Sequence, residues 1–378
     1  MGKKIIRAST IGLSLNIFCK DLLRELADEG YEVVALSSPD EDLREVEKRE
    51  KVRAVGVQME RRMSPLKDIV SLVKLVRVFA KEKPDMVHSM TPKAGLLCMV
   101  AGWMTGVPVR VHTFTGLVWP TAQGLSRRIL MLTDKITCMC ATHVVPEGEG
   151  VKLDLQRCIT KKEMKVLGYG NVRGINMDEW KRRVGWRDGL MLTFVFIGRI
   201  VRDKGVDELV AAFVKLNRIY SNTRLLLVGP YEEHLNPVQS GTKFLIDTCE
   251  CIEAVGSQKD VRPFYEQSDV LVFPSYREGF PNVVIEAGAM ELPSIVTDIN
   301  GSREIIEDGR NGLIVPARDE QALFEAMKWM VEHDEERNAM AAHARPMIAS
   351  RYEQGYVRGC LKNYYKEIFA RNCGSFAK

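Results

Sequence analysis

The stretch DVLVFPSYREGFPNVVIEAGAMELPSIVTD, residues 269–298, decides the predicted fold. DVLVFPS predicts a buried strand, PSIVTD predicts a second strand, and the residues from Pro281 onward predict a helix between them. Proline has the fixed φ and the missing N–H that suit the first position of a helix. A strand, a helix and a strand in this order are typical of a parallel sheet covered by helices.

The same alternation extends over both halves of the chain. It predicts an α/β protein with two doubly wound, Rossmann-like domains facing a cleft. Past residue 320 the pattern is helical only. The predicted strands of the first half are KKIIRAST, YEVVALSS, VRAVGVQM, DMVHSM and VPVRVHTF, with helices near 16–29, 65–82 and 92–105. Those of the second half are LTFVFIGRI, TRLLLVG, DVLVFPS, PSIVTD and GLIVP, with helices near 205–219, near 241–254 and after Pro281.

The composition is that of a globular protein of two domains, with 378 residues, 46% hydrophobic and 28% charged. Its 54 basic and 50 acidic residues nearly balance, which argues against a nucleic-acid partner. Nine cysteines without a recognisable secretory signal predict reduced thiols in a cytoplasm. The longest uncharged run, Ala94–Val109, is shorter than the roughly 20 residues that span a bilayer, so no transmembrane helix is expected.

Two glutamates flank the start of the helix after Pro281. Glu278 lies in the loop at the carboxyl end of the strand, where doubly wound sheets bind ligands, and Glu286 lies about one turn into the helix. Helical side chains lean toward the N-terminus, so both carboxylates are predicted to reach one ligand rich in hydroxyl groups. The alternative is that Glu278 caps the helix and Glu286 lies on the surface. The backbone N–H groups expected to point at the same ligand are those of Phe280, Asn282 and Val283.

A second candidate element is FIGRIVRDKGVDELV, residues 196–210. A strand is predicted to end at Gly198, and Arg199 and Lys204 follow in a charged loop before the next helix. Two cations at the carboxyl edge of a strand can hold a diphosphate, Arg199 through its planar fork and Lys204 as a point charge. The alternative is an ordinary solvated loop.

These stretches, continued through DINGSREIIEDGRNGLIVP, resemble the donor-binding half of the GT-B glycosyltransferases of family 4, whose E-x7-E pattern Glu278 and Glu286 match. The resemblance implies a retaining, metal-independent transfer of a sugar from a nucleoside-diphosphate donor. It also implies that Glu286 holds the ribose, Glu278 the donor sugar, and Arg199 with Lys204 the diphosphate.

The first half carries HSMTPKAG, residues 88–95, and RVHTFTG, residues 110–116. Both resemble a branch of this family that builds lipid-linked capsule, O-antigen or glycoprotein saccharides in bacteria. The resemblance implies a catalytic His112 beside the donor sugar, and the alternative is a core histidine. The family often has a Gly-Gly pair in its first loop, where STIGLSLN offers only Gly12, which we assign with Gly198 to donor binding.

Domain roles follow from the same resemblance. Residues 1–170 are predicted to form the acceptor-side domain, 171–188 the linker, 189–352 the nucleotide-sugar domain, and 353–378 a C-terminal helix that packs back on the first domain. The expected reaction moves a hexose or N-acetylhexosamine from a UDP-sugar to a polyprenyl-diphosphate-linked saccharide, with no cofactor or metal, at the cytoplasmic face of the membrane. Two alternatives stay open: a nucleotide-sugar-binding scaffold without activity, and a nucleotide-sugar epimerase.

Two other patterns could suggest metal sites. Asp40-Glu41-Asp42 has the spacing of a DxD metal motif, but the acids before LREVEKRE favour a helix N-terminus. The C-x-C pairs, Cys138 with Cys140 and Cys249 with Cys251, lack the usual zinc spacing, and residues two apart on a helix diverge. Reduced structural cysteines are therefore predicted.

The helix predicted over residues 65–83 is amphipathic and basic. It can pack on the sheet through its apolar stripe or contact anionic lipid headgroups. The stripe is predicted to contain Ile69, Leu72, Val73, Val76 and Phe79, and the basic residues are Lys67, Lys74, Arg77, Lys81 and Lys83. Arg61 and Arg62 precede this helix, and Arg127 and Arg128 follow later in the chain.

Overall fold

The computed structural model describes residues 2–183, 191–232 and 236–375. The chain forms two compact units: Met1–Gly174 with Gly355–Lys378, and Ile175–Gln354. The part of the predicted linker over 184–188 lies outside the described residues.

The first unit is built on a parallel sheet, which has six strands within the described residues, in the order β3-β2-β1-β4-β5-β6. Its strands are β1 (Lys4–Ala8), β2 (Glu32–Ser37), β3 (Arg53–Gly56), β4 (Met86–Met90), β5 (Val109–Phe114) and β6 (His143–Pro146). Its helices are α1 (Gly12–Phe18), α2 (Leu22–Asp28), α3 (Glu41–Glu50), α4 (Pro65–Glu82), α5 (Pro92–Met104), α6 (Gly124–Cys140), α7 (Glu149–Cys158) and α15 (Gln354–Ser375).

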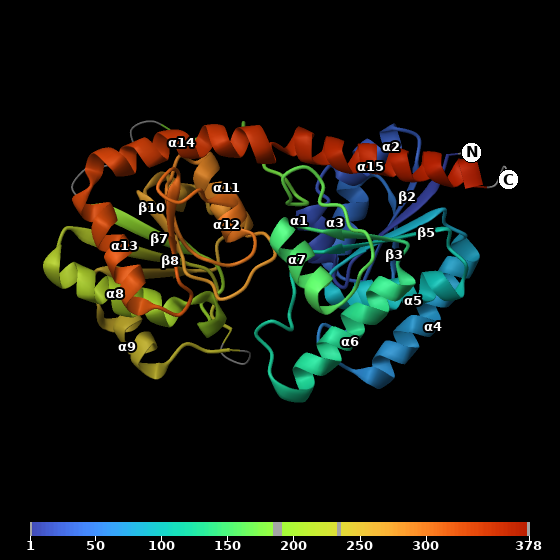
Figure 1. Ribbon diagram of the computed structural model, residues 1–378, viewed down its shortest axis with the longest axis horizontal. Helices are drawn as coiled ribbons and strands as arrows, with labels where there is room; N and C mark the ends of the chain where they lie inside the picture. Colours follow the sequence, from blue (N-terminus) through green and yellow to red (C-terminus); the bar gives the residue numbers. More distant parts are fainter. Residues whose placement is uncertain (1, 184–190, 233–235, 376–378) are drawn as a thin grey trace. The chain divides into compact units, whose positions relative to one another are not determined.

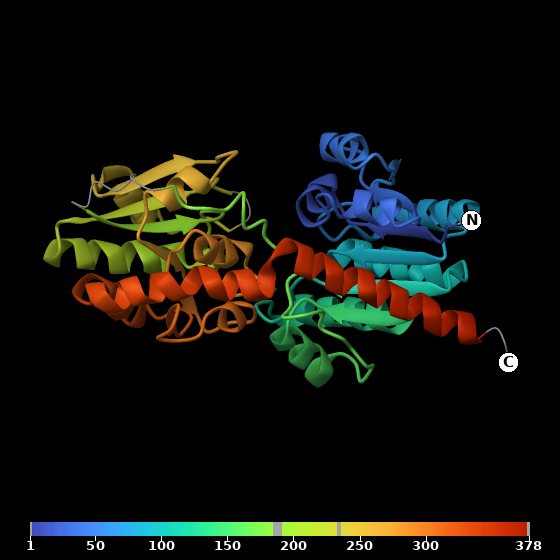
Figure 2. The same ribbon diagram turned by 90° about the horizontal axis from the view of Figure 1, so that it is seen from above.

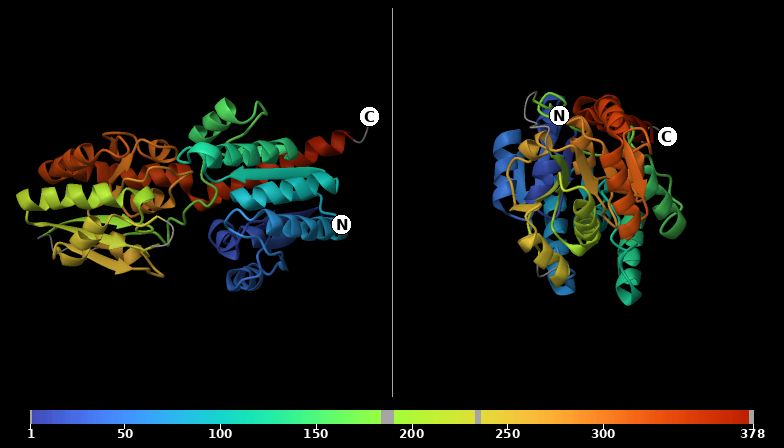
Figure 3. Two further views of the ribbon diagram at one scale, coloured as in Figure 1. Left: turned by 90° about the horizontal axis from the view of Figure 1, so that it is seen from below. Right: turned by 90° about the vertical axis from the view of Figure 1, so that its left-hand side faces the viewer.

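Side chains of successive strand residues enter two separate cores on the two faces of this sheet. Ile6 and Val34 belong to the core under α4, α5 and α6, whereas Ile5 and Val33 belong to the core under α1, α2, α3 and α15. The alternation follows from the period of two in a β-strand. Figure 1 and the view from below in Figure 3 show α4, α5 and α6 together on their face of the sheet.

The C-terminal helix α15 is fixed to the first unit by buried and charged contacts. Tyr365 is fully buried and accepts a hydrogen bond of 2.8 Å from Arg7 of β1, and burial raises the pKa of its phenol to about 12. Arg358 and Lys362 form ion pairs with Glu25 of α2. Accordingly, α15 runs beside α2 in Figures 1 and 2.

The second unit repeats this topology. Within the described residues its parallel sheet also has six strands, in the order β12-β11-β10-β7-β8-β9, which is the first sheet's connectivity seen from the other edge. Its strands are β7 (Leu192–Ile197), β8 (Thr223–Val228), β9 (Ile252–Gly256), β10 (Val270–Phe273), β11 (Ser294–Thr297) and β12 (Gly312–Val315). Its helices are the 3-10 helix η1 (Arg202–Lys204), α8 (Val206–Ile219), α9 (Ser240–Thr248), α10 (Arg262–Glu266), α11 (Asn282–Ala289), α12 (Ser302–Ile305), α13 (Glu320–Glu332) and α14 (Asp334–Tyr352).

Helices cover both faces of the second sheet as well. Helix α13 packs against α8, and α11 packs against α14 so closely that a Cβ added to Gly288 would lie 2.6 Å from Ile348 Cγ1. The predicted fold class, an α/β protein of two doubly wound domains, is confirmed.

Three predicted helix boundaries are wrong. The helix expected over 16–29 is two helices, because Asp21 adopts a left-handed φ of 63° that breaks the first one. The helix expected over 241–254 ends at Thr248, and β9 follows. Because the chain turns there, Cys249 and Cys251 do not diverge, and their Sγ atoms lie 2.8 Å apart. Helix α11 begins at Asn282, so Pro281 is its N-cap and not, as expected, its first residue.

The apolar stripe predicted for α4 is also wrong in part. The buried side chains are Ser71, Leu75 and Phe79, whereas Ile69 and Val73 of the predicted stripe are exposed. The helix therefore packs through a face rotated from the expected one, and part of its apolar surface faces solvent.

Candidate functional site

In both sheets the strand order reverses at one point, and in the second unit the loops of Lys204 and Glu278 leave the sheet there. The reversal lies between β1 and β4 in the first sheet and between β7 and β10 in the second. Doubly wound proteins bind ligands outside the carboxyl ends of the strands at such a switch point. The two loops that leave these ends are residues 198–205 and 274–281.

These two loops are held together by their backbones. Gly205 has a φ of +69°, and a Cβ at this position would lie 2.1 Å from the carbonyl oxygen of Pro274. The N–H of Tyr276 donates to the carbonyl of Asp203 over 2.9 Å. Glycine at residue 205 thus permits the close approach that brings the side chains of the two loops into contact.

The approach places Lys204 against Glu278. The Lys204 ammonium forms a hydrogen-bonded ion pair with Oε1 of Glu278, which also accepts a bond of 2.8 Å from Ser275 Oγ. The two charged side chains are 17% and 18% exposed, so the pair is largely removed from water. The ring of Phe273 lies under the ammonium, 5.1 Å from Nζ. Two residues that the sequence assigned to different parts of one ligand are thus joined directly.

Arg199 is oriented differently. Its guanidinium pairs with Glu232, a residue that the sequence analysis did not single out. The backbones before these two residues also approach closely, since a Cβ on Gly229 would lie 1.9 Å from the carbonyl oxygen of Gly198. Shared binding of a diphosphate by Arg199 and Lys204 therefore stays a prediction.

Glu286 is buried inside the second unit. It is 6% exposed, which excludes a surface glutamate, and it accepts a hydrogen bond of 3.2 Å from the phenol of Tyr265. Tyr265 comes from α10, and its phenol also lies 3.0 Å from the carbonyl of Val283. Glu278 does not cap α11, whose N-cap Pro281 has no side-chain cap. Convergence of Glu278 and Glu286 on one ligand stays a prediction.

The other donor-binding candidates of this unit surround the start of α11. Phe280 is buried, with its ring 5.5 Å from that of Tyr352. Gly301 approaches so closely that an added Cβ would lie 2.7 Å from Phe280 Cα. Asn282 is the first residue of α11 and Val283 the second. A ligand contact by their amides stays a prediction.

Gly12, predicted to bind the donor, is engaged within the first unit. Its N–H donates to Asp40 Oδ2 over 2.8 Å, and a Cβ at Gly12 would lie 2.1 Å from Asp40 Oδ1. Asp40 also caps α3 by accepting from the N–H of Leu43. The sequence Asp40-Glu41-Asp42 is thus at a helix N-terminus, as predicted. The amide of Gly12 donates its hydrogen bond to the capping residue Asp40.

His112 lies in the interior of β5 and not at its end. It is 1% exposed, its Nδ1 lies 2.9 Å from Ser89 Oγ, and its ring packs against the backbone of α5 at Gly95. Burial lowers the pKa of its imidazole from 6.5 to about 3, so the ring is neutral at physiological pH. This placement fits the alternative of a core histidine.

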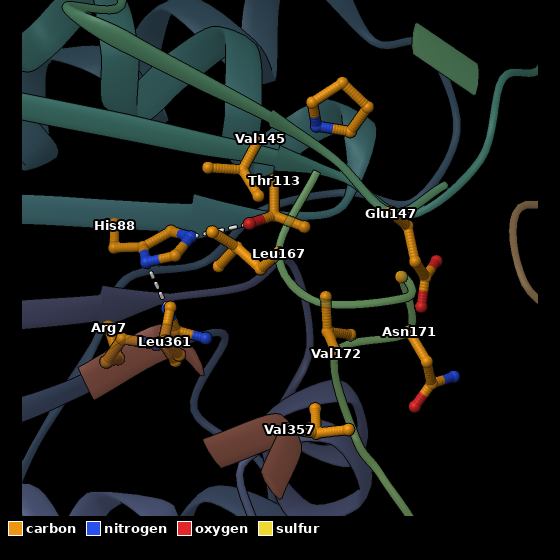
Figure 4. Close-up of a pocket in the computed structure, with 12 residues that line it drawn as sticks. Arg7, His88, Thr113, Val145, Glu147, Leu167, Asn171, Val172, Val357 and Leu361 are labelled. Atoms are coloured by element: carbon orange, nitrogen blue, oxygen red, sulfur yellow. Dashed lines mark hydrogen bonds between the residues drawn. The ribbon is translucent and has the colours of Figure 1, made fainter. Parts of the chain in front are cut away.

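A small cavity with polar and apolar lining residues lies on the α15 side of the first unit. Its volume is about 20 Å³, enough for one water molecule. Figure 4 shows His88 between Arg7 and Thr113, and its Nε2 lies 2.7 Å from Thr113 Oγ1. Burial and the adjacent Arg7 lower the pKa of His88. This network anchors α15 and leaves no room for a substrate.

A larger pocket, which the sequence analysis missed, lies at the switch point of the first sheet. It has a volume of about 360 Å³ and lies where β1 and β4 end. The only local signal was HSMTPKAG, which supplies Thr91, Pro92 and Lys93. The pocket is lined by Thr10, Ile11, Ser14, Arg61, Met63, Asp68, Thr91, Pro92, Lys93, Leu96, Val118, Leu130 and Thr133.

The described part of the chain contains neither a membrane-spanning helix nor a cluster of metal-ligating side chains. Over residues 2–183, 191–232 and 236–375, no helix combines the length and apolar character needed to cross a membrane. The same residues contain no group of three or more His, Cys, Asp or Glu side chains suited to a metal ion.

Family comparisons match both halves of the chain. The family described as glycosyl transferases group 1 matches residues 192–333, which include the loops of Lys204 and Glu278. The family described as glycosyl transferase 4-like domain matches residues 15–169.

Individual proteins resemble the chain over most of its length. The capsular polysaccharide biosynthesis glycosyltransferase CapM of Staphylococcus aureus is 29% identical over 381 residues, which cover 98% of this chain and 99% of CapM. The UDP-Gal:alpha-D-GlcNAc-diphosphoundecaprenol alpha-1,3-galactosyltransferase of Escherichia coli is 25% identical over 77% of each chain. The structure of Anabaena HepE in complex with UDP-glucose superposes with a TM-score of 0.79 at 15% identity, covering 96% of this chain and 99% of HepE. At that identity the last likeness concerns the fold alone.

Proposed function

The chain belongs to the GT-B glycosyltransferases, and we propose that it transfers a hexose or N-acetylhexosamine from a UDP-sugar to a polyprenyl-diphosphate-linked saccharide. The observation that carries the proposal is the ion pair of Lys204 and Glu278 at the switch point of the second unit, in the same fold unit as the buried Glu286. The donor and acceptor classes are those that the name of the Escherichia coli relative states for that enzyme. The products would be UDP and the lipid-linked saccharide extended by one sugar. This saccharide would serve polysaccharide biosynthesis, the process that the name of CapM states for CapM.

In the proposed donor complex, the diphosphate of the UDP-sugar replaces Glu278 as the partner of Lys204. Glu278 then accepts hydrogen bonds from hydroxyls of the donor sugar, and Glu286 accepts them from the ribose. Transfer with retention builds negative charge on the departing diphosphate. Lys204 and Arg199 stabilise that charge, which is the kind of electrostatic effect that contributes most to many enzymes.

Lipid-linked acceptors require contact with a membrane, and α4 offers a surface suited to it. Leu66 and Ile69 are 82% and 59% exposed, and Val70 is exposed beside them. Lys67 and Lys74 lie on the same helix, so apolar and cationic groups occur together. Such a helix binds the interface of an anionic bilayer. We place the protein at the cytoplasmic face of the membrane, held peripherally.

The proposal is tested by incubating the full chain with a panel of UDP-sugars and a lipid extract of bacterial membranes. Transfer is measured as UDP release together with labelled sugar in the lipid fraction. The Lys204→Ala variant should lose transfer. Lys215→Ala, which removes an exposed lysine paired with Glu320 in the same unit, should not. Full activity of Lys204→Ala would contradict the proposal.

The same assay separates the two alternatives. A binding scaffold releases no UDP, whereas an epimerase leaves the sugar on its nucleotide with a changed configuration.

We further propose that Lys204 and Arg199 stabilise the charge of the diphosphate, as a divalent metal does in other transferases. Turnover should therefore persist in excess EDTA, and its loss on chelation, with recovery on adding Mg²⁺ or Mn²⁺, would reject this part of the proposal.

A further inference from the structure

The pocket at the switch point of the first sheet is built for a ligand of mixed chemistry. We propose that it binds the sugar-diphosphate junction of the lipid-linked acceptor, with the first isoprene units leaving between α4 and α6. This inference rests on the acceptor class proposed above. Its volume of about 360 Å³ lies within the range of roughly 300–1,000 Å³ that is typical of small-molecule pockets.

The pocket carries an uncompensated positive charge. Among the residues that the structure describes, Arg61 has neither an ion-pair nor a hydrogen-bond partner. Lys93 also lines the pocket, but its ammonium lies 2.5 Å from Asp68 Oδ2 and is neutralised by it. An anion entering the pocket would gain its main attraction from Arg61, whose planar fork suits phosphate oxygens.

Asp68 adds a second polar requirement. Its Oδ2 accepts from Lys93, whereas its buried Oδ1 has no hydrogen-bond partner in the described part of the chain. A buried carboxylate oxygen without a donor is costly unless a ligand or water supplies one. A hydroxyl or N-acetyl N–H of the sugar next to the diphosphate would supply that donor.

Besides the hydroxyl groups of Thr10, Ser14, Thr91 and Thr133, the pocket has an apolar wall, which a plain anion or a free sugar would not need. Ile11, Leu96 and Leu130 lie in the wall with Met63 and Val118. The pocket therefore combines a cation, an unpaired acceptor and an apolar wall, which together match an amphiphilic diphosphate.

Exposed apolar side chains continue from the pocket onto the helices beside it. Met63 lines the pocket and is itself exposed, as are Leu66 of α4 and Leu125 and Ile129 of α6. Figure 1 shows α4, α5 and α6 as neighbours, and α5 packs against both of the others. Arg127 and Arg128 in the first turns of α6 are exposed cations. An isoprenoid chain leaving the pocket would meet this apolar surface before reaching an anionic bilayer.

The inference is tested by calorimetric titration of the full chain with farnesyl diphosphate, and separately with inorganic diphosphate and with farnesol. Farnesyl diphosphate should bind more tightly than either fragment. Arg61→Ala should weaken the binding of farnesyl diphosphate by about tenfold or more, because a charged hydrogen bond is lost. Lys81→Ala, which removes an exposed lysine near the other end of α4, is the matched control and should change nothing.

Two further variants locate the binding site. Leu130→Trp fills the pocket and should abolish binding, and its thermal unfolding shows whether the fold is intact. Lys204→Ala alters the second unit only and should leave farnesyl diphosphate binding unchanged. Unchanged affinity in Arg61→Ala, or equal affinity for inorganic diphosphate and farnesyl diphosphate, would overturn the inference.

The failure of this inference is distinguishable from failure of the proposed function. If the function holds and the inference fails, wild type and Arg61→Ala transfer sugar with the same KM for the lipid acceptor. If the function fails and the inference holds, no UDP-sugar supports transfer, yet farnesyl diphosphate still binds and still depends on Arg61.

Discussion

Lys204 and Glu278 form an ion pair across two loops that follow adjacent parallel strands, β7 and β10. Without a ligand, the ammonium that would hold a diphosphate is therefore occupied by the carboxylate that would hold a sugar. We expect the diphosphate of UDP to compete with Glu278 for this ammonium. We predict that Glu278→Gln binds UDP several-fold more tightly than wild type while losing transfer, because Lys204 is then available to the diphosphate.

Substitution of Lys204, the cationic partner in the ion pair, should have the opposite effect. Lys204→Ala should weaken the binding of UDP by about tenfold, since a charge-assisted hydrogen bond to phosphate is lost. Both affinities are measured by calorimetry, with Lys215→Ala as control. Weaker UDP binding in Glu278→Gln would show that the pair helps rather than competes with the diphosphate.

The second prediction concerns the backbone contact that sets this geometry. Gly205→Ala would place a Cβ 2.1 Å from the carbonyl oxygen of Pro274, at a φ of +69° that alanine disfavours. The loops must separate, so we expect a loss of about 2 kcal/mol or more in the free energy of unfolding. UDP affinity should fall as well. Chemical denaturation and calorimetry measure the two effects.

Gly241 provides a control of the same chemistry. It lies in the first turn of α9, with open space around an added Cβ and no positive φ. Gly241→Ala should leave UDP affinity unchanged and raise stability by up to about 0.5 kcal/mol. Equal effects of the two substitutions would mean that the close contact at Gly205 is not what positions the loops.

How far the sequence predicts this site depends on whether contacts are local. Lys204 and Glu278 each follow a strand by a few residues, so the rule for switch points places them near one another without coordinates. Glu232 and Tyr265 could not be foreseen, because they reach Arg199 and Glu286 from separate elements and no local pattern marks them. Cys249 and Cys251 show the same limit, since their proximity depends on where α9 ends.

The pocket of the first unit was missed for a related reason. Its wall comes from α1, α4, α5 and α6 and the loops before them, so its residues are scattered over more than a hundred positions of the sequence. Helix α6 itself was not predicted, although its LMLTDKITC run is apolar at intervals. For α4, hydrophobic periodicity identified the helix but not which of its apolar residues would be buried.

The exposed apolar face of α4 leads to the third prediction. Replacing Leu66 and Ile69 together by Glu should abolish sedimentation of the protein with vesicles that contain phosphatidylglycerol, because charge replaces the apolar contact. Phe244→Glu is the control, since Phe244 is a similarly exposed apolar residue in the second unit. Vesicle binding that survives the double substitution would place the membrane contact elsewhere.

The fourth prediction distinguishes a core role of His112 from a catalytic one. The pKa of the native imidazole is about 3, against 6.5 in the unfolded chain. Between these values the unfolded state binds a proton that the native state does not, so stability falls as pH drops from 6.5 toward 3. His112→Phe should reduce this dependence in urea unfolding at pH 4.5 and 7.5. It should also retain transfer, and a folded but inactive variant would instead support contact with the donor sugar.

The last prediction uses a half-buried acid of α6, Asp134. Burial raises the pKa of the Asp134 carboxyl from 3.8 to about 7. Between these two values the native state binds a proton that the unfolded state has lost, so this group lowers stability as pH rises from about 4 to 7. Asp134→Asn should therefore stabilise the protein at pH 8 and leave its stability at pH 4 nearly unchanged. Asp28→Asn, at an exposed position of α2, is the control and should shift neither value. Equal stabilisation by Asp134→Asn at both pH values would mean that the amide improves packing rather than removing a buried charge.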